Sequence, residues 1–139
     1  MKSRIEKTLE NHKKGYNCAQ AVACAYCDLV DIDEATMFKM NEGFGLGMGG
    51  AEGICGAISG AVALAGLVNC DGDINNPKTK RETYKLSKEI LERFREKNKS
   101  VICKDLKGLE TQKALRSCDG CIEDAAAIAE SVLFNKKED

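Results

Sequence analysis

Apolar residues gather in two stretches of this chain that carry almost no charge. One spans residues 18–30, CAQAVACAYCDLV, and the other spans residues 54–68, ICGAISGAVALAGLV. Since the second stretch is apolar on every side of a helix, it predicts a helix buried at the centre of the fold. It is shorter than the ~20 residues that a bilayer requires, so we expect no membrane insertion.

Capping residues mark where the other helices begin. A side chain that accepts hydrogen bonds from free N–H groups stands before each of the first three helical stretches. These predicted helices are residues 4–13, with Ser3 and Glu6 as a capping box, residues 18–30 with Asn17, and residues 34–44 with Asp33. In the second half, Asn76 and Pro77 predict the start of a long charged helix that ends near residue 99. Asp119 caps the last predicted helix, residues 121–134.

Two further segments shape the expected fold. Six glycines between Gly43 and Gly53 predict a flexible or tightly turned segment that leads into the central helix. In the long charged helix, an apolar stripe could cover the bundle or pair with a second copy of the chain, so we expect a homodimer. The stripe consists of Tyr84, Ser87, Ile90, Leu91 and Phe94.

The composition agrees with one helical domain. The chain has 139 residues, 43% of them hydrophobic, with one Pro and no Trp. It lacks segments in which β-branched residues alternate with polar ones. We therefore predict an all-α fold as a single domain over residues 1–139. The expected architecture is a compact bundle of about five to seven helices with the small-residue helix 54–68 at its centre.

The charge balance limits the possible partners. A net charge of -1 argues against binding to nucleic acid or to an anionic membrane surface. Residues 78–104 nevertheless hold ten basic and four acidic residues. A solvated helix face explains this segment, and docking of an acidic partner is the alternative. No basic segment followed by an apolar stretch opens the chain, so we expect no signal peptide and predict a cytoplasmic protein.

Eight cysteines carry the candidate chemistry. Cytosolic thiols are kept reduced and seldom form structural disulfides, so metal, cluster or redox chemistry is favoured. Cys18, Cys55 and Cys118 lie at or just before predicted helix starts, where free N–H groups stabilise the thiolate form. At ~100° per residue along one helix, Cys24 and Cys27 point away from the side that Cys18 faces.

Two Cys-x-x-Cys pairs leave other interpretations open. Cys24–Cys27 and Cys118–Cys121 together could form a four-thiolate zinc site, although zinc ribbons place such pairs on tight turns. A thioredoxin-type dithiol at the second pair would follow a strand, which the pattern does not predict. The single histidine, His12, is interpreted as a surface residue, and one histidine leaves no basis for a Ser/His/Asp hydrolase.

Small residues surround Cys55. Gly56 and Gly60 would allow close crossing of two helices. Together with Gly53, they also leave room beside the sulfur for backbone N–H groups and a bulky inorganic group. The three glycines are therefore candidate cofactor-binding residues.

Four pieces of the chain resemble the C_GCAxxG_C_C family, small redox-active proteins of bacteria and archaea. The pieces are GYNCAQAV around Cys18, GICGAISGA around Cys55, SVICKDL around Cys103 and RSCDGCIEDAA around Cys118. The resemblance implies an all-helical fold, four characteristic cysteines and a redox role. A related domain occurs in split-Soret cytochromes, where an iron–sulfur cluster is associated with it.

Carried onto this chain, the resemblance implies a metal site made by Cys18, Cys55, Cys103 and Cys118. The remaining cysteines are extra, namely Cys24, Cys27, Cys70 and Cys121. Without a Cys-x-x-Cys-His motif, no attached haem is indicated. We expect an electron-transfer or redox-sensing module rather than an enzyme with its own substrate. It would hold an iron–sulfur cluster, most simply [2Fe-2S], and exchange electrons with a partner protein. The alternatives are a thiol–disulfide oxidoreductase and a structural zinc protein.

Overall fold

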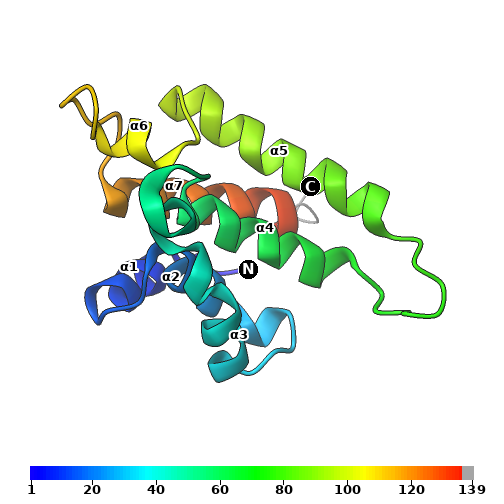
Figure 1. Ribbon diagram of the computed structural model, residues 1–139. Coiled ribbons are helices and arrows are strands. Elements are labelled where there is room, and N and C mark those ends of the chain that lie inside the picture. Colours follow the sequence, from blue (N-terminus) through cyan, green and yellow to red (C-terminus); the bar gives the residue numbers. More distant parts are fainter. Residues whose placement is uncertain (136–139) are drawn as a thin grey trace.

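The computed structural model describes residues 1–135, and these residues form a bundle of α-helices (Figure 1). The helices are α1 (Ile5–Lys13), α2 (Cys18–Cys24), α3 (Glu34–Asn41), α4 (Gly56–Asn69), α5 (Lys80–Asn98), α6 (Cys103–Lys107) and α7 (Cys118–Ala129). Within residues 1–135 the only β-type pairing is one isolated antiparallel bridge between Ile54 and Ile102. The all-α prediction is confirmed.

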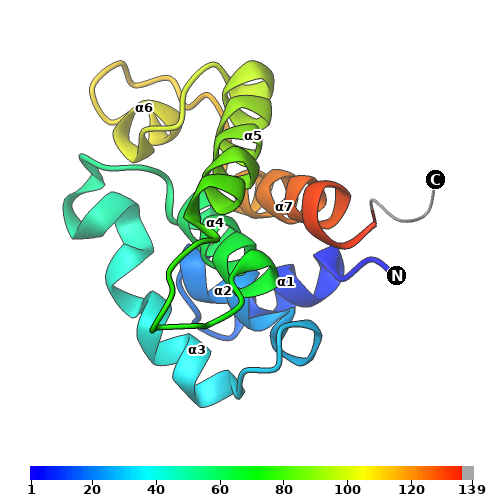
Figure 2. The same ribbon diagram turned by 90° about the vertical axis from the view of Figure 1, so that its right-hand side faces the viewer.

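Helix α4 forms the centre of the bundle. It packs against α2, α5 and α7, and in Figures 1 and 2 it lies between α5 on one side and α2 on the other. Ala57, Ala61 and Ala65 are fully buried along it. At Gly60, a Cβ atom would lie 2.6 Å from the backbone oxygen of Ala19, so only glycine permits this crossing with α2. The predicted central small-residue helix is confirmed.

Local capping explains the starts of α2 and α3. Asn17 accepts a hydrogen bond from the Gln20 N–H, and the Gln20 side chain accepts one from the Asn17 N–H. Asp33 accepts a hydrogen bond from the Thr36 N–H. Both capping residues are the ones that the sequence predicts, because such caps depend on side chains only three residues apart.

The capping box predicted at the start of α1 is not formed. Arg4 occupies the capping position, and its own side chain makes no capping hydrogen bond. Ser3 accepts a hydrogen bond from the Ile5 N–H at 3.4 Å, which is not the spacing of the expected capping box. Arg4 instead donates a hydrogen bond from its backbone N–H to the Glu130 carboxylate at 2.7 Å. The tertiary contact with the C-terminal segment fixes this helix end in place of the local one.

The charged helix starts later than predicted. α5 begins at Lys80 rather than at Pro77, and Lys78 in the preceding loop forms an ion pair with Asp71 at 2.6 Å. Its predicted apolar stripe is buried at Ile90 and Phe94. The Tyr84 side chain, by contrast, is 63% exposed and lies beside the loop.

The start of α7 also differs from the prediction. Ser117 caps this helix by accepting a hydrogen bond from the Gly120 N–H at 2.9 Å, so the helix begins at Cys118. The predicted cap, Asp119, bonds to His12 on α1 instead. Cys118 therefore lies in the first turn of α7, where the N–H groups are free.

The glycine-rich segment winds in the left-handed direction. Leu46, Gly47, Met48 and Gly49 all have positive φ angles between 53° and 89°, as does Ala51 at 66°. For residues other than glycine this conformation costs about 1–2 kcal/mol each, so tertiary contacts must hold the segment. One contact is clear, because a Cβ atom on Gly47 would overlap the Cys103 side chain. The prediction of a tight turn is confirmed.

Across residues 1–135, no helix has the length and apolar character needed to cross a membrane.

Candidate functional site

Five of the eight cysteines line one cavity of about 170 Å³. Four of them stand at helix starts: Cys18, Cys103 and Cys118 are the first residues of α2, α6 and α7, and Cys55 is the capping residue of α4. The fifth is Cys121, one turn into α7. The structure therefore brings together all four cysteines of the predicted metal site.

The α2 capping box fixes the position of Cys18. Its sulfur accepts hydrogen bonds from the backbone N–H groups of Ala19 and Leu46, the latter in the left-handed segment. A Cβ atom on Gly56 would lie 2.5 Å from this sulfur, so the glycine at the start of α4 makes room for it. Burial, followed by the nearby Cys55, raises the pKa of Cys18 despite these donors.

A short antiparallel pairing holds Cys55 beside Cys103. The Cys55 N–H donates to the Val101 carbonyl at 2.8 Å, and the Cys103 N–H donates to the Gly53 carbonyl at 2.9 Å. Burial is the main factor that raises the pKa of Cys103. These two backbone bonds align two distant chain segments and so place both sulfurs on the same cavity wall.

The three candidate cofactor-binding glycines lie in different surroundings, and one of them lines the cavity. Gly56 lines the cavity, whereas Gly53 holds Cys103 through its carbonyl and packs tightly against Met48. Gly60 lies in the helix crossing with Ala19. The structure therefore gives Gly60 a packing contact and leaves Gly56 beside the sulfurs.

Lys107 approaches Cys118 from the end of α6. Its Nζ donates to the Cys118 sulfur at 3.2 Å, and this contact raises the pKa of Lys107. An ammonium group at this distance stabilises negative charge on a sulfur. The short helix α6 thus contributes a thiol at its first residue and a cation at its last.

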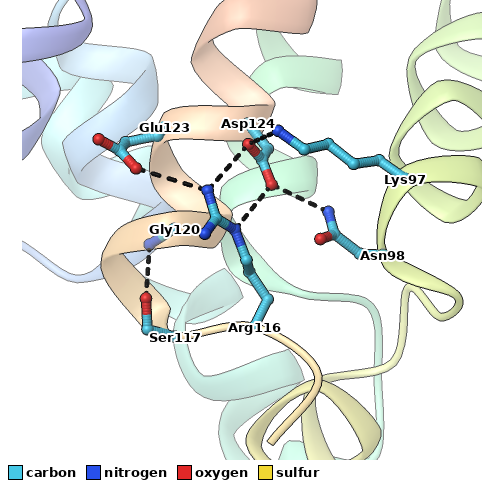
Figure 3. A network of polar contacts seen from close by, with 7 residues as sticks. All are labelled: Lys97, Asn98, Arg116, Ser117, Gly120, Glu123 and Asp124. Atoms are coloured by element: carbon cyan, nitrogen blue, oxygen red, sulfur yellow. Dashed lines mark hydrogen bonds and ion pairs between the residues drawn. The ribbon is translucent and has the colours of Figure 1, made fainter.

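A polar network fixes the chain just before α7 (Figure 3). The buried Asp124 carboxylate accepts hydrogen bonds from Arg116 at 3.0 and 3.2 Å, from Lys97 at 2.6 Å and from Asn98 at 3.1 Å. Burial raises the pKa of Asp124, but these donors outweigh it and hold that pKa below its usual range. The network ties α7 to the end of α5 and holds Arg116 at the cavity.

Cys55 has the most activated thiol in the cavity. A hydrogen bond from the Cys121 thiol lowers the pKa of Cys55 to about 7, with help from the N–H groups of Ala57 and Ile58 and against the effect of burial. The same hydrogen bond and burial raise the pKa of Cys121 well above its usual value. The Cys121 thiol therefore favours negative charge on the Cys55 sulfur.

The other cysteines lie away from the cavity. Helix α2 ends at Cys24, and Cys27 begins a separate 3₁₀ turn, so the assumption of one helix through both residues is wrong. Their side chains hydrogen-bond each other near Glu34. Burial is the main factor that raises the pKa of Cys24 to about 12. Cys70 is exposed in the loop after α4.

Three cationic or basic side chains also line the cavity, and the sequence did not single them out for this. They are His12, Lys107 and Arg116. His12 is half-buried rather than on the open surface, and its Nδ1 lies 2.8 Å from the Asp119 carboxylate. One sequence signal was available, since Lys107 and Arg116 both lie close in sequence to candidate cysteines.

Thiol sulfurs are the main candidate metal donors around the cavity. Among residues 1–135, no three His, Cys, Asp or Glu side chains are grouped closely enough to hold one metal ion. The sulfurs stand around a cavity instead, with N–H groups and a cation directed at them. Soft thiolates in this number are the ligands that iron–sulfur clusters use.

Comparisons with known proteins place the chain among relatives. Residues 16–132 match the family model described as "Putative redox-active protein (C_GCAxxG_C_C)". An uncharacterized protein of Archaeoglobus fulgidus is 32% identical over 130 residues, covering 82% of this chain and 86% of that protein. No solved structure matches the chain.

Proposed function

Because this chain belongs to the C_GCAxxG_C_C family of redox-active proteins, we propose that its cysteine cavity binds an iron–sulfur cluster, most simply [2Fe-2S]. The proposed ligands are Cys18, Cys55, Cys103 and Cys118. Such a centre supplies reversible one-electron transfer. The proposed role is therefore electron transfer or redox sensing together with a partner protein.

The observation that carries this proposal is the meeting of four helix starts at one cavity. Each start presents free N–H groups and the positive end of its helix dipole, and both favour anions. The Cys18 and Cys55 sulfurs each receive two backbone N–H donors, and Lys107 lies beside Cys118. Hydrogen bonds to the ligand sulfurs are among the factors that set a cluster's reduction potential.

The cavity among the sulfurs gives room for a cluster. A volume of about 170 Å³ is lined by five cysteines. Thiolates are the ligands that iron–sulfur clusters use, and a cluster of iron and sulfide needs such a space between its ligands.

An electron partner would need to reach the cavity from outside. Leu46 lines the cavity and is 49% exposed, and the neighbouring Met48 is 53% exposed. These side chains give the site an apolar edge against which a partner protein could dock.

Anaerobic purification and reconstitution with iron and sulfide test the proposal. We expect a coloured protein whose visible spectrum and iron and sulfide content agree with one cluster per chain. The variant Cys103→Ser should lose most of the colour, whereas Cys24→Ala, remote from the cavity, should keep it. A protein that stays colourless and metal-free, or that binds zinc without sulfide, would contradict the proposal.

A further inference from the structure

A second hollow, the apolar groove, lies between α4 and α5 beside the left-handed segment. These two helices run side by side in both views (Figures 1 and 2). The groove encloses about 490 Å³ and is lined mainly by apolar side chains, among them Ile58 on α4, Leu91 on α5 and the half-exposed Met48. Of the described residues that line it, only Lys88 is charged. An open apolar hollow of this kind is typical of a site where another molecule binds.

Three cations follow one line along α5 beside this groove. Arg81, Lys88 and Arg95 are spaced seven residues apart, which is close to two helical turns, so their side chains leave the helix on the same side. All three are exposed, and Lys88 also lines the groove. These three residues form a cation row along the edge of the apolar groove.

The cation row is left without carboxylate partners inside the chain. Elsewhere on α5, Lys85 pairs with Glu82 at 3.3 Å and Arg93 pairs with Glu89. Glu92 lies one turn from Lys88, yet over residues 1–135 no ion pair joins it or any other carboxylate to the row. The charge of the row therefore stays open to a carboxylate from outside.

We propose that the apolar groove and the cation row together dock an acidic partner protein. The partner would insert apolar side chains into the groove and set carboxylates against Arg81, Lys88 and Arg95. Burial of the apolar side chains would supply most of the affinity, and the opposite charges would steer the approach and fix the orientation.

The same two features favour a protein over other anions. The sugar–phosphate backbone of a nucleic acid offers no apolar side chain to fill the groove. An anionic membrane surface would meet a chain whose net charge is -1. A protein can present carboxylates and apolar side chains together on one surface, which matches the cation row beside the groove.

The groove lies directly beside a proposed cluster ligand. Ile54 lines the groove, and the next residue, Cys55, lines the cysteine cavity. One turn along, the Ile58 N–H donates to the Cys55 carbonyl at 3.0 Å, and Ile58 also lines the groove. A docked partner would therefore approach the cavity from the Cys55 side. That this partner exchanges electrons rests on the proposed function, whereas the docking surface does not.

A synthetic acidic helix tests the surface on the full chain. The probe is an amphipathic peptide with Leu and a single Trp on its apolar face and Glu along both flanks. Because the chain has no Trp, the emission comes from the peptide alone and should shift to shorter wavelength when the ring enters the groove. Added salt should weaken binding, since ions screen exposed charges. Equal binding by the same peptide with Gln in place of Glu would overturn the proposal.

Two matched double variants test the cation row. Lys88→Gln with Arg95→Gln should weaken binding of the acidic peptide roughly tenfold. Lys85→Gln with Arg93→Gln removes as much charge from paired positions and should bind as the parent protein does. Circular dichroism checks that both variants are folded. An equal loss in both would show that overall charge, and not the row, attracts the peptide, which would overturn the proposal.

One further variant tests the groove. Ser59→Glu places a carboxylate in the groove lining and should abolish both the binding and the emission shift. Unchanged binding by this variant would place the peptide elsewhere and overturn the proposal.

Other occupants are decided by the same set of variants. Phosphatidylserine vesicles and duplex RNA are the comparison probes, and tighter binding of either through Lys88 and Arg95 would overturn the proposal. Light scattering that finds a dimer which Ser59→Glu separates into monomers would assign the groove to a second copy and would overturn it as well.

Reconstitution with iron and sulfide separates this proposal from the proposed function. If the peptide binds as expected and the chain takes up no cluster, the proposed function fails and the docking surface stands. If the chain takes up the cluster and the peptide does not bind, only the docking surface fails.

Discussion

The two ends of α2 hold cysteines in opposite surroundings. At its start, Cys18 faces the cavity and receives hydrogen bonds from the N–H groups of Ala19 and Leu46. At its end, Cys24 and Cys27 contact each other near Glu34, and the charge of Lys14 only weakly opposes the burial that raises the pKa of Cys24. A helix start favours an anion and a helix end disfavours one.

A second comparison, between Cys24 and Cys55, holds burial equal and changes the hydrogen-bond donors. Cys24 and Cys55 are almost equally buried, at 5% and 6% exposed. The pKa of Cys24 is raised to about 12, mainly by burial, whereas a hydrogen bond from Cys121 leads the factors that lower the pKa of Cys55 to about 7. Hydrogen-bond donors, rather than burial, therefore distinguish the two thiols.

Substitution of the proposed ligands should give the largest difference in cluster content between the cavity cysteines and the Cys24–Cys27 pair. Changing Cys18 or Cys103 to Ser should remove most of the cluster, since a four-thiolate centre has no ligand to spare. Cys118→Ala should keep part of it, because Cys121 lies one turn further along α7 and can take over. The measurements are iron and sulfide content and the visible spectrum.

The double variant at Cys118 and Cys121 should hold no cluster. Cys24→Ala is the matched control and should hold a full one. If Cys24 or Cys27 proved necessary for iron binding, the division between the two ends of α2 would be wrong.

The next largest difference should be in how the alkylation rates of Cys55 and Cys24 depend on pH. In the cluster-free protein, the thiolate is the form that reacts, so modification of Cys55 by a small alkylating reagent should rise as the pH passes about 7. Cys24 should stay unmodified at pH 8, well below its pKa of about 12. Mass spectrometry of the peptides gives both rates. Because the two cysteines are equally buried, equal rates at pH 8 would refute the role of the hydrogen-bond donors.

Helix packing at the start of α2 should have an intermediate effect. Gly60→Leu should destabilise the protein by roughly 1–3 kcal/mol or more, because a Cβ atom there already meets the Ala19 backbone. Gly66→Ala, on the same helix with nothing within 4 Å of its Cβ, is the control and should stabilise by up to ~1 kcal/mol. Thermal unfolding measures both, and an unchanged melting temperature for Gly60→Leu would show that the crossing is looser than described.

The smallest effect should come from the far end of α2. Cys24→Ala removes one buried sulfur from the core and should cost about 1 kcal/mol in the free energy of unfolding. Urea unfolding of the metal-free protein measures this cost. A loss several times larger would mean that the Cys24–Cys27 contact stabilises the fold in its own right.

Local patterns predicted much of the fold. The apolar helix around residues 54–68 and the caps Asn17 and Asp33 depend on neighbouring side chains, and they are confirmed. The start of α5 was wrong, and the cap of α7 is the local residue Ser117, which the prediction did not use. The predicted cap of α1 and the predicted role of Asp119 were also wrong, because Arg4 and Asp119 bond to distant residues. Such contacts leave no trace in a local pattern.

Contacts between distant residues also explain why only part of the site could be predicted from the sequence. Cys18, Cys55 and Cys118 could be placed at helix starts from the pattern alone, but the helix start at Cys103 could not. α6 is a short helix that the Gly53 carbonyl helps to position, and Lys107 reaches Cys118 only through that arrangement. The homodimer, the cofactor and the electron partner stay predictions.

The left-handed segment has a consequence for how this chain can change during evolution. Residues 46–51 supply the Leu46 N–H to Cys18 and cover Cys103 at Gly47, so both contacts depend on which residue occupies which position. An inserted or deleted residue would move Gly47 out of its place and put a bulkier side chain against the sulfur. The length of this segment should therefore be invariant among functional relatives even where its sequence varies.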